Sequence, residues 1–135
     1  MWFGFRFICV SQHRIIGSAR HILKLITSRR FQALKIGAHV SASGGLDKAI
    51  SRAQALGAET IQLFASSPRA WAFNYPDDET VSAFRRMAKI SNISPIFIHG
   101  SYLVNLAGKD DLVGKSVDLL IKTMEVASLI GADGV

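Results

Sequence analysis

Residues 35–64 read KIGAHVSASGGLDKAISRAQALGAETIQLF, and this stretch decides the fold. Its first part, 35–40, is a short and mostly apolar run, which is typical of a buried strand. A turn at 41–45 follows, and apolar residues at helical spacing then lead to Gly57, which predicts a helix that ends there. A second apolar run at 60–64 predicts another strand. Strand, helix and strand in this order predict a parallel βαβ unit.

The same alternation continues to the last residue. Acidic residues at 77–79 predict a helix start, with an inner face of Val81, Phe84, Met87 and Ala88. Residues 95–98 predict a third strand. A third helix ends at Gly131, and its predicted inner face comprises Val113, Val117, Leu120, Ile121, Met124 and Ala127. The junction at 56–59, LGAE, is repeated as IGAD at 130–133, so we expect a fourth strand to begin near Asp133.

The spacing of these units indicates the architecture. A (β/α)8 TIM barrel of about 250 residues uses roughly 31 residues per unit, so residues 35–135 amount to about three units. We therefore expect an α/β fold comprising the N-terminal three units of a TIM barrel, and a chain that is truncated.

The formal net charge of +6 comes entirely from one end of the chain. Residues 1–34 hold six basic residues and no acidic one, whereas residues 35–135 hold ten of each. The leader, 1–34, has three interpretations: an organelle transit peptide, a membrane-surface or nucleic-acid arm with a basic amphipathic helix over 15–26, or a start assigned upstream of a non-AUG start near Leu34. We expect a cytoplasmic protein, or an organellar one if the leader is a transit peptide.

Composition excludes other classes. A single cysteine, Cys9, excludes an internal disulfide framework and a cysteine-rich zinc site. No apolar run approaches the ~18 residues of a membrane span, so we expect no membrane partner.

Chemistry is expected at the carboxyl ends of the strands. His39 and His99 lie there, and each is either a metal ligand or a hydrogen-bonded histidine of the barrel rim. Arg69 beside Trp71 suits phosphate contact and stacking, or is a solvated arginine beside a packed ring. Tyr102 and Leu103 could enter a duplex or pack a loop. The turn at 41–45 could hold an anion or be an ordinary turn.

Three of these segments together resemble the endonuclease IV family (AP endonuclease family 2). Residues 36–46, IGAHVSASGGL, are similar to the family's opening strand and loop. QLF at 62–64 followed by PRAW at 68–71 resembles its second strand and DNA-inserting loop, and IHGSYLVNL at 98–106 resembles its third strand end. The resemblance covers 35–135 and implies the N-terminal part of a xylose-isomerase-like TIM barrel.

The resemblance also implies a function. The family cleaves the phosphodiester 5′ to apurinic/apyrimidinic sites during base excision repair, and it repairs blocked 3′ ends, using three zinc ions. It implies that His99 is a zinc ligand and that Arg69, Tyr102 and Leu103 enter the DNA. His39 is placed near the site floor, and Asn105 is expected to order the loop. The family's other ligands come from later strands, so we expect a monomeric chain that is inactive and poorly folded alone.

Two other interpretations stay open. A sugar isomerase or epimerase barrel shares the strand–helix rhythm and the metal-binding strand ends. A non-enzymatic fragment would at most bind DNA weakly through its basic leader.

Overall fold

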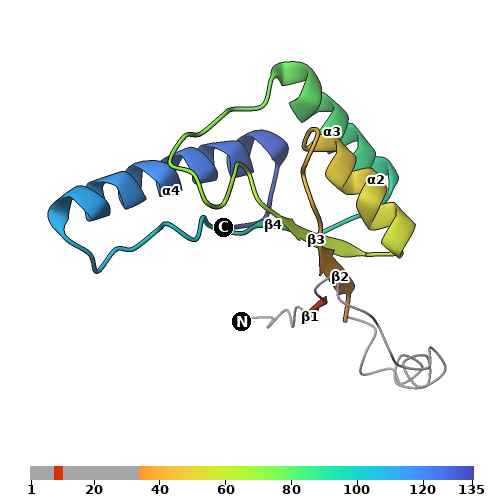
Figure 1. The fold of residues 1–135 in the computed structure, drawn as a ribbon. Coiled ribbons are helices and arrows are strands. Elements are labelled where there is room, and N and C mark those ends of the chain that lie inside the picture. The colour runs from red at the N-terminus through yellow and green to blue at the C-terminus, as the bar shows by residue number, and fades with distance from the viewer. Residues whose placement is uncertain (1–7, 11–33) are drawn as a thin grey trace, which may run out of the picture.

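A computed structural model describes residues 8–10 and 34–135 of the chain. Four parallel strands form one sheet in the order β1–β2–β3–β4. They span Ile8–Val10 (β1), Ile36–His39 (β2), Thr60–Leu63 (β3) and Ile96–Ile98 (β4). The described helices are α2 (Asp47–Leu56), α3 (Asp78–Ile90) and α4 (Asp110–Ile130) (Figure 1). The predicted alternation of strands and helices over 35–135 is confirmed.

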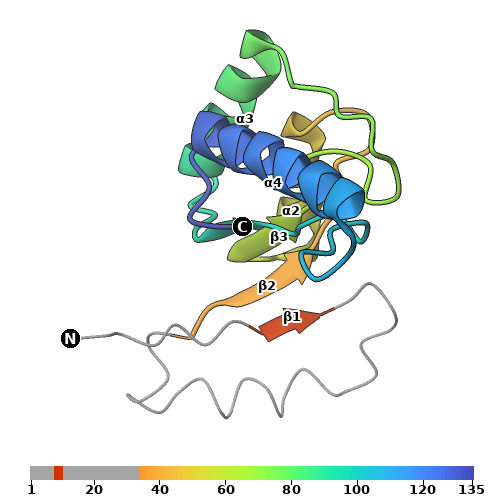
Figure 2. The same cartoon turned by 90° about the vertical axis from the view of Figure 1, so that its left-hand side faces the viewer.

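The core lies between the sheet and the helices, all three of which lie on one side of the strands (Figures 1 and 2). Strand side chains on this side are almost fully buried: Ala38, Ile61, Leu63, Ile96 and Ile98. On the opposite side lie half-buried side chains in one register, with His39 beside Gln62 and Gln62 beside Phe97. Because side chains alternate along a strand, these residues point away from the helices. They form a second face of the sheet that the three described helices do not cover.

After α4 the chain pairs with β4, at the place where the repeated junction predicts a further strand. Gly134 forms a parallel bridge with Phe97. The amide of Asp133 donates to the carbonyl of Ile96 at 2.7 Å, and the amide of Ile98 donates to the carbonyl of Gly134 at 2.9 Å. The chain therefore joins the sheet beside β4 at the predicted place, as a single bridge and not as a full strand.

Helix α3 follows its sequence pattern closely. Asp77 caps it, because its carboxylate accepts the backbone amide of Thr80 at 2.7 Å. Phe84 and Ala88 are buried, and Val81 and Met87 pack against the core. The predicted inner face is confirmed.

The predicted inner face of helix α4 is wrong. Val117, Ile121 and Met124 are exposed, Val113 and Leu120 are half-buried, and of the six predicted residues Ala127 alone is buried. The buried stripe is Ser116, Leu119, Thr123, Val126, Ala127 and Ile130. Two of these are hydroxyl residues that donate to the helix itself: Ser116 to the carbonyl of Leu112 and Thr123 to that of Leu119, each at 2.7 Å. These bonds let polar residues occupy the buried stripe at little cost.

Strand β1 lies within the basic leader, where the sequence did not predict an element. It pairs with β2, with Ile8 opposite Ile36 and Val10 opposite Ala38. The amphipathic helix expected over 15–26 lies outside the described residues. Within the described part of the chain, no helix is both long and apolar enough to cross a membrane.

Candidate functional site

A cavity of about 1030 Å³ opens at the carboxyl ends of β2, β3 and β4. His39, Gln62, Phe64, His99 and Tyr102 line it, together with the turn after β2 and the residues that lead into α3. The strands place these side chains at one edge because parallel strands end on the same side of a sheet. Two of the predicted site residues, His39 and His99, therefore share one cavity with Tyr102.

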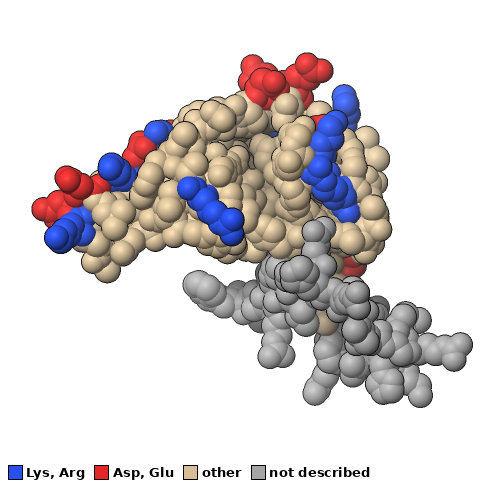
Figure 3. All heavy atoms as spheres, in the orientation of Figure 1, with Lys and Arg blue, Asp and Glu red and all other residues tan. Residues whose placement is uncertain are grey.

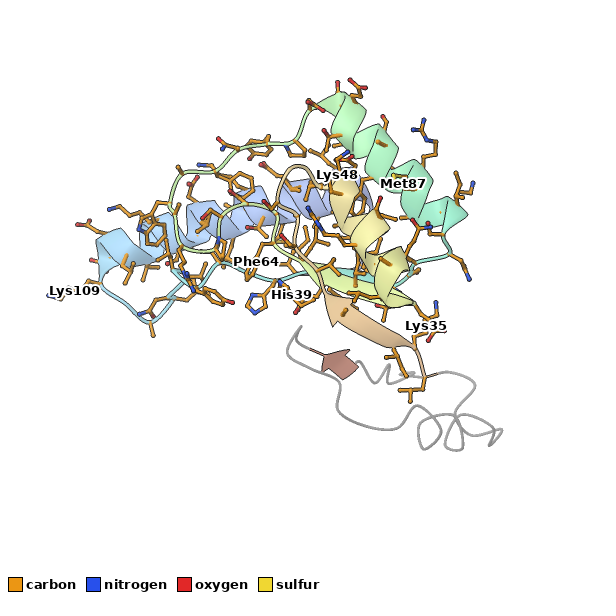
Figure 4. All side chains as sticks on the ribbon, turned by 45° about the vertical axis from the view of Figure 1, so that its right-hand side comes forward. Lys35, His39, Lys48, Phe64, Met87 and Lys109 are labelled. Atoms are coloured by element: carbon orange, nitrogen blue, oxygen red, sulfur yellow. The ribbon has the colours of Figure 1, made fainter. Side chains whose placement is uncertain are left out.

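Aromatic and imidazole rings form a cluster in this cavity. The Phe64 ring lies 4.8 Å from the His39 ring, 4.8 Å from the His99 ring and 5.3 Å from the Tyr102 ring, measured between centroids. Figure 4 shows Phe64 beside His39 at the ends of their strands. Phe64 is thus the centre of the cluster, although it was not among the predicted site residues. Its position just after a strand, at the same level as the two histidines, was the available signal.

Both histidines use Nδ1 in a hydrogen bond to an oxygen that can only accept. The His99 Nδ1 lies 2.6 Å from the carbonyl oxygen of Gly100, and the His39 Nδ1 lies 3.1 Å from the Oε1 of Gln62. Each Nδ1 therefore carries the proton, and in the neutral imidazole Nε2 keeps its lone pair. That tautomer is the one that a metal ligand bound through Nε2 requires.

The described residues do not complete a metal site by themselves. A zinc site needs three or four protein ligands. In the described part of the chain, no group of three or more His, Cys, Asp or Glu side chains is placed to hold a metal ion. His99 has the tautomer of a ligand, but it lacks partners among these residues.

Two loops meet above the cavity. We call residues 65–71 the Arg69 loop and residues 99–105 the Tyr102 loop. The carbonyl of Pro68 accepts the hydroxyl of Ser101 at 2.8 Å and the amide of Tyr102 at 3.1 Å. The structure thereby brings Arg69 and Tyr102, which are distant in sequence, onto adjoining loops.

The side chains on these loops differ in exposure. Tyr102 is 59% exposed and Trp71 39%, which is high for large aromatic residues, and Arg69 is also exposed. Leu103 is half-buried. An open aromatic side chain beside an arginine can contact a base or a sugar and a phosphate together.

Asn105 lies at the end of the Tyr102 loop. Its Oδ1 accepts the amide of Ala107 at 3.0 Å, and its own amide donates to the hydroxyl of Ser116 at 2.9 Å. The bond to Ser116 fastens the loop to the buried face of α4, and the bond from Ala107 closes a local turn.

The turn at 41–45 is held from within the fold. Arg52, on α2, donates to the carbonyls of Ser41 and Ser43, each at 2.7 Å. The amides of Ser43 and Gly45 donate to the Ser41 hydroxyl and the Ala42 carbonyl inside the turn. Because these two amides are already bonded, they are not available to the anion that the sequence suggested.

Tyr75 joins the chain beyond the Arg69 loop to α4. Its hydroxyl donates to the carboxylate of Glu125, and this bond raises the pKa of Tyr75 to about 12. In Figure 3 the acidic side chains at the start of α3 form one group, and charges of both signs alternate along the far end of α4. The face seen in this view is thus not broadly basic.

The comparison with protein families decides the class of this fold. A family model described as a xylose isomerase-like TIM barrel matches residues 50–135. The chain belongs to this family.

Within the xylose isomerase-like TIM barrels, the chain is similar to endonuclease IV proteins. It is 40% identical over 101 residues to a probable endonuclease 4 of Persephonella marina, covering 74% of this chain and 35% of that protein. It is 38% identical over 101 residues to a probable endonuclease 4 of Halothermothrix orenii, covering 74% and 36%. The crystal structure of endonuclease IV from Thermus thermophilus superposes with a TM-score of 0.71 at 40% identity, covering 73% of this chain and 38% of that one.

These findings confirm the resemblance to the endonuclease IV family and the barrel architecture. The chain spans about 35% of the length of the curated relatives that it matches.

Proposed function

We propose that this chain forms the DNA-recognition part of an AP endonuclease, a DNA repair enzyme that cleaves the phosphodiester 5′ to an abasic site in a zinc-dependent step. Its relatives of 38–40% identity are probable endonucleases 4, which supports a nuclease. The observation that carries the proposal is the meeting of the Arg69 and Tyr102 loops above the cavity, with Arg69 and Tyr102 exposed.

The chemistry of these loops suits a duplex that lacks a base. An abasic nucleotide leaves a gap in the base stack, and an aromatic or apolar side chain can fill that gap without displacing a paired base. Tyr102 rests against Phe64 at its inner side and is open on the other. Arg69 can pair with a flanking phosphate, and Leu103 follows Tyr102 into the same gap. A blocked 3′ end offers a similar opening.

The same residues set a limit on the isolated chain. We propose His99 as one zinc ligand, and the described residues do not supply the further ligands that zinc requires. The 135-residue chain alone should therefore recognise abasic DNA without cleaving it. His39 contributes to the floor of the site through its contact with Phe64.

Binding to matched duplexes tests this proposal. Fluorescence anisotropy would compare a labelled duplex that carries one tetrahydrofuran abasic analogue with the intact duplex. We expect the full chain to prefer the abasic duplex roughly tenfold, which corresponds to about 1.4 kcal/mol. Because nonspecific attraction between basic side chains and phosphates acts on both duplexes alike, the affinity ratio reports the loops. Equal affinity for the two duplexes would contradict the proposal.

Variants assign the preference to residues. Tyr102→Ala should reduce the preference by roughly tenfold, since base–aromatic stacking contributes about 1–3 kcal/mol. Arg69→Ala should weaken binding to both duplexes and reduce its salt dependence, because a phosphate contact is not specific to the lesion. Lys89→Ala, which removes an exposed cation at the end of α3, is the matched control and should change neither. Strand cleavage by the isolated chain with added zinc would contradict the expected inactivity.

A further inference from the structure

We propose that Ser101 is a positioning residue that joins the Arg69 loop and the Tyr102 loop into one rigid recognition element. This inference rests on the proposed function and extends it to a residue that touches no DNA. The Ser101 hydroxyl donates to the carbonyl of Pro68 at 2.8 Å and accepts the amide of Leu103 at 3.2 Å. One side chain thus bonds the residue before Arg69 and the residue after Tyr102.

The hydroxyl has to donate and accept at the same time. The carbonyl of Pro68 requires a donor, and the amide of Leu103 requires an acceptor. Serine and threonine can do both in this position, whereas alanine can do neither. Ser101 is half-buried, so water replaces the lost bonds incompletely.

Further contacts of the two loops with each other and with the strand ends are made by Tyr102. The amide of Tyr102 also donates to the carbonyl of Pro68, at 3.1 Å, and the Tyr102 ring contacts Phe64 and His99. Those contacts fix Tyr102 against the strand ends. The bond of Ser101 to the Leu103 amide fixes the backbone just after Tyr102. Its bond to the Pro68 carbonyl fixes the backbone just before Arg69, and so the orientation of Arg69. Without Ser101, binding would have to order both loops, which lowers affinity for the lesion.

The test compares Ser101→Ala with Ser101→Thr in the full chain, using the abasic and intact duplexes described above. Ser82→Ala, which alters an exposed serine of α3 outside both loops, is the matched control. We expect Ser101→Ala to lower the preference for the abasic duplex about threefold to tenfold, as the loss of one or two hydrogen bonds predicts. Affinity for the intact duplex should fall less, because the Arg69 phosphate contact is common to both duplexes whereas the Tyr102 contact is specific to the abasic one. Ser101→Thr should restore the preference, and Ser82→Ala should leave it unaltered.

Amide hydrogen exchange of Leu103 and Tyr102 gives a second measurement that does not depend on DNA. Exchange should accelerate at Leu103 in Ser101→Ala and return to the wild-type rate in Ser101→Thr. An undiminished abasic preference in Ser101→Ala would overturn this inference while the proposed function stands. Equal binding of both duplexes by the wild-type chain would instead overturn the proposed function. Unchanged hydrogen exchange of the Leu103 amide in Ser101→Ala would overturn the proposed link between the two loops, whichever result the DNA binding gives.

Discussion

At the scale of single residues, Gly37 is a position in the sheet where a side chain does not fit. A Cβ atom there would lie 2.4 Å from the carbonyl oxygen and 2.5 Å from the Cγ2 of Thr60, on the neighbouring strand. Thr60 cannot move aside, because it is 1% exposed and its hydroxyl donates to the carbonyl of Pro95. We expect Gly37→Ala to lower the free energy of unfolding by about 1–3 kcal/mol in urea denaturation.

Gly114→Ala is the control for Gly37→Ala. Gly114 lies in α4 with nothing within 4 Å of the added atom, so alanine there should stabilise the chain by about 0.5–1 kcal/mol. A Gly37→Ala protein as stable as the wild type would mean that β2 and β3 are farther apart than described.

Tyr75 has a distinct dependence on pH. The hydrogen bond to Glu125 raises its pKa to about 12 from the ordinary value of 10.0. The folded state therefore holds this proton more tightly than the unfolded state, so the bond stabilises the fold fully below pH 10 and is lost as pH rises toward 12. Since Tyr75 and Tyr102 are the two tyrosines of the sequence, phenolate absorbance of wild type minus Tyr75→Phe isolates Tyr75.

The difference curve should have its midpoint well above the ordinary tyrosine pKa of 10.0. Glu125→Ala should bring that midpoint back toward the ordinary tyrosine value, because it removes both the hydrogen bond and the carboxylate charge. A wild-type midpoint at the ordinary value would show that Tyr75 and Glu125 do not pair.

At the scale of elements, patterns predicted β2, β3, β4, α2 and α3 well because each has one apolar face or one short apolar run. Helix α4 is apolar on several sides, so hydrophobicity did not identify the side that packs. The buried side contains Ser116 and Thr123, whose hydroxyls are satisfied within the helix, and no hydrophobic pattern includes them. The buried side of α4 therefore could not be identified from hydrophobicity alone, because local hydrogen bonds satisfy the polar residues on it.

A pair of identical substitutions tests the orientation of α4. Leu119 is 3% exposed and Leu129 is 44% exposed. Leu119→Ala should lower the free energy of unfolding by about 2–5 kcal/mol, since it removes a buried apolar side chain and leaves a cavity beside α4. Leu129→Ala should cost less than about 1 kcal/mol, as exposed positions generally do. Similar losses at both positions, measured by urea denaturation, would contradict the described rotation of the helix.

At the scale of the whole molecule, sequence reasoning located the site but not its internal contacts. The rule that parallel strands end on one side placed His39, His99 and the two loops at one edge. The bond between Ser101 and Pro68 joins residues 33 positions apart, and it depends on how the loops fold back over the cavity. The pairing of β1 with β2 is likewise a long-range contact. Strand β1 is only three residues long, and so short an apolar segment does not predict a strand or its partner.

Strand β1 covers the edge of β2. The hydrogen bonds between β2 and β3 show which amides of β2 face β1 instead. The carbonyl of Ile36 and the amide of Val40 bond to residues of the β3 side, Glu59 and Gln62. Because backbone groups alternate along a strand, the amides of Gly37 and His39 point the other way, toward β1. Deletion of residues 1–10 should accelerate hydrogen exchange at Gly37 and His39, while the amides of Ala38 and Val40 stay protected. The uncovered edge should also increase self-association, measured by light scattering. Slow exchange at Gly37 and His39 after the deletion would mean that β1 does not cover this edge in solution.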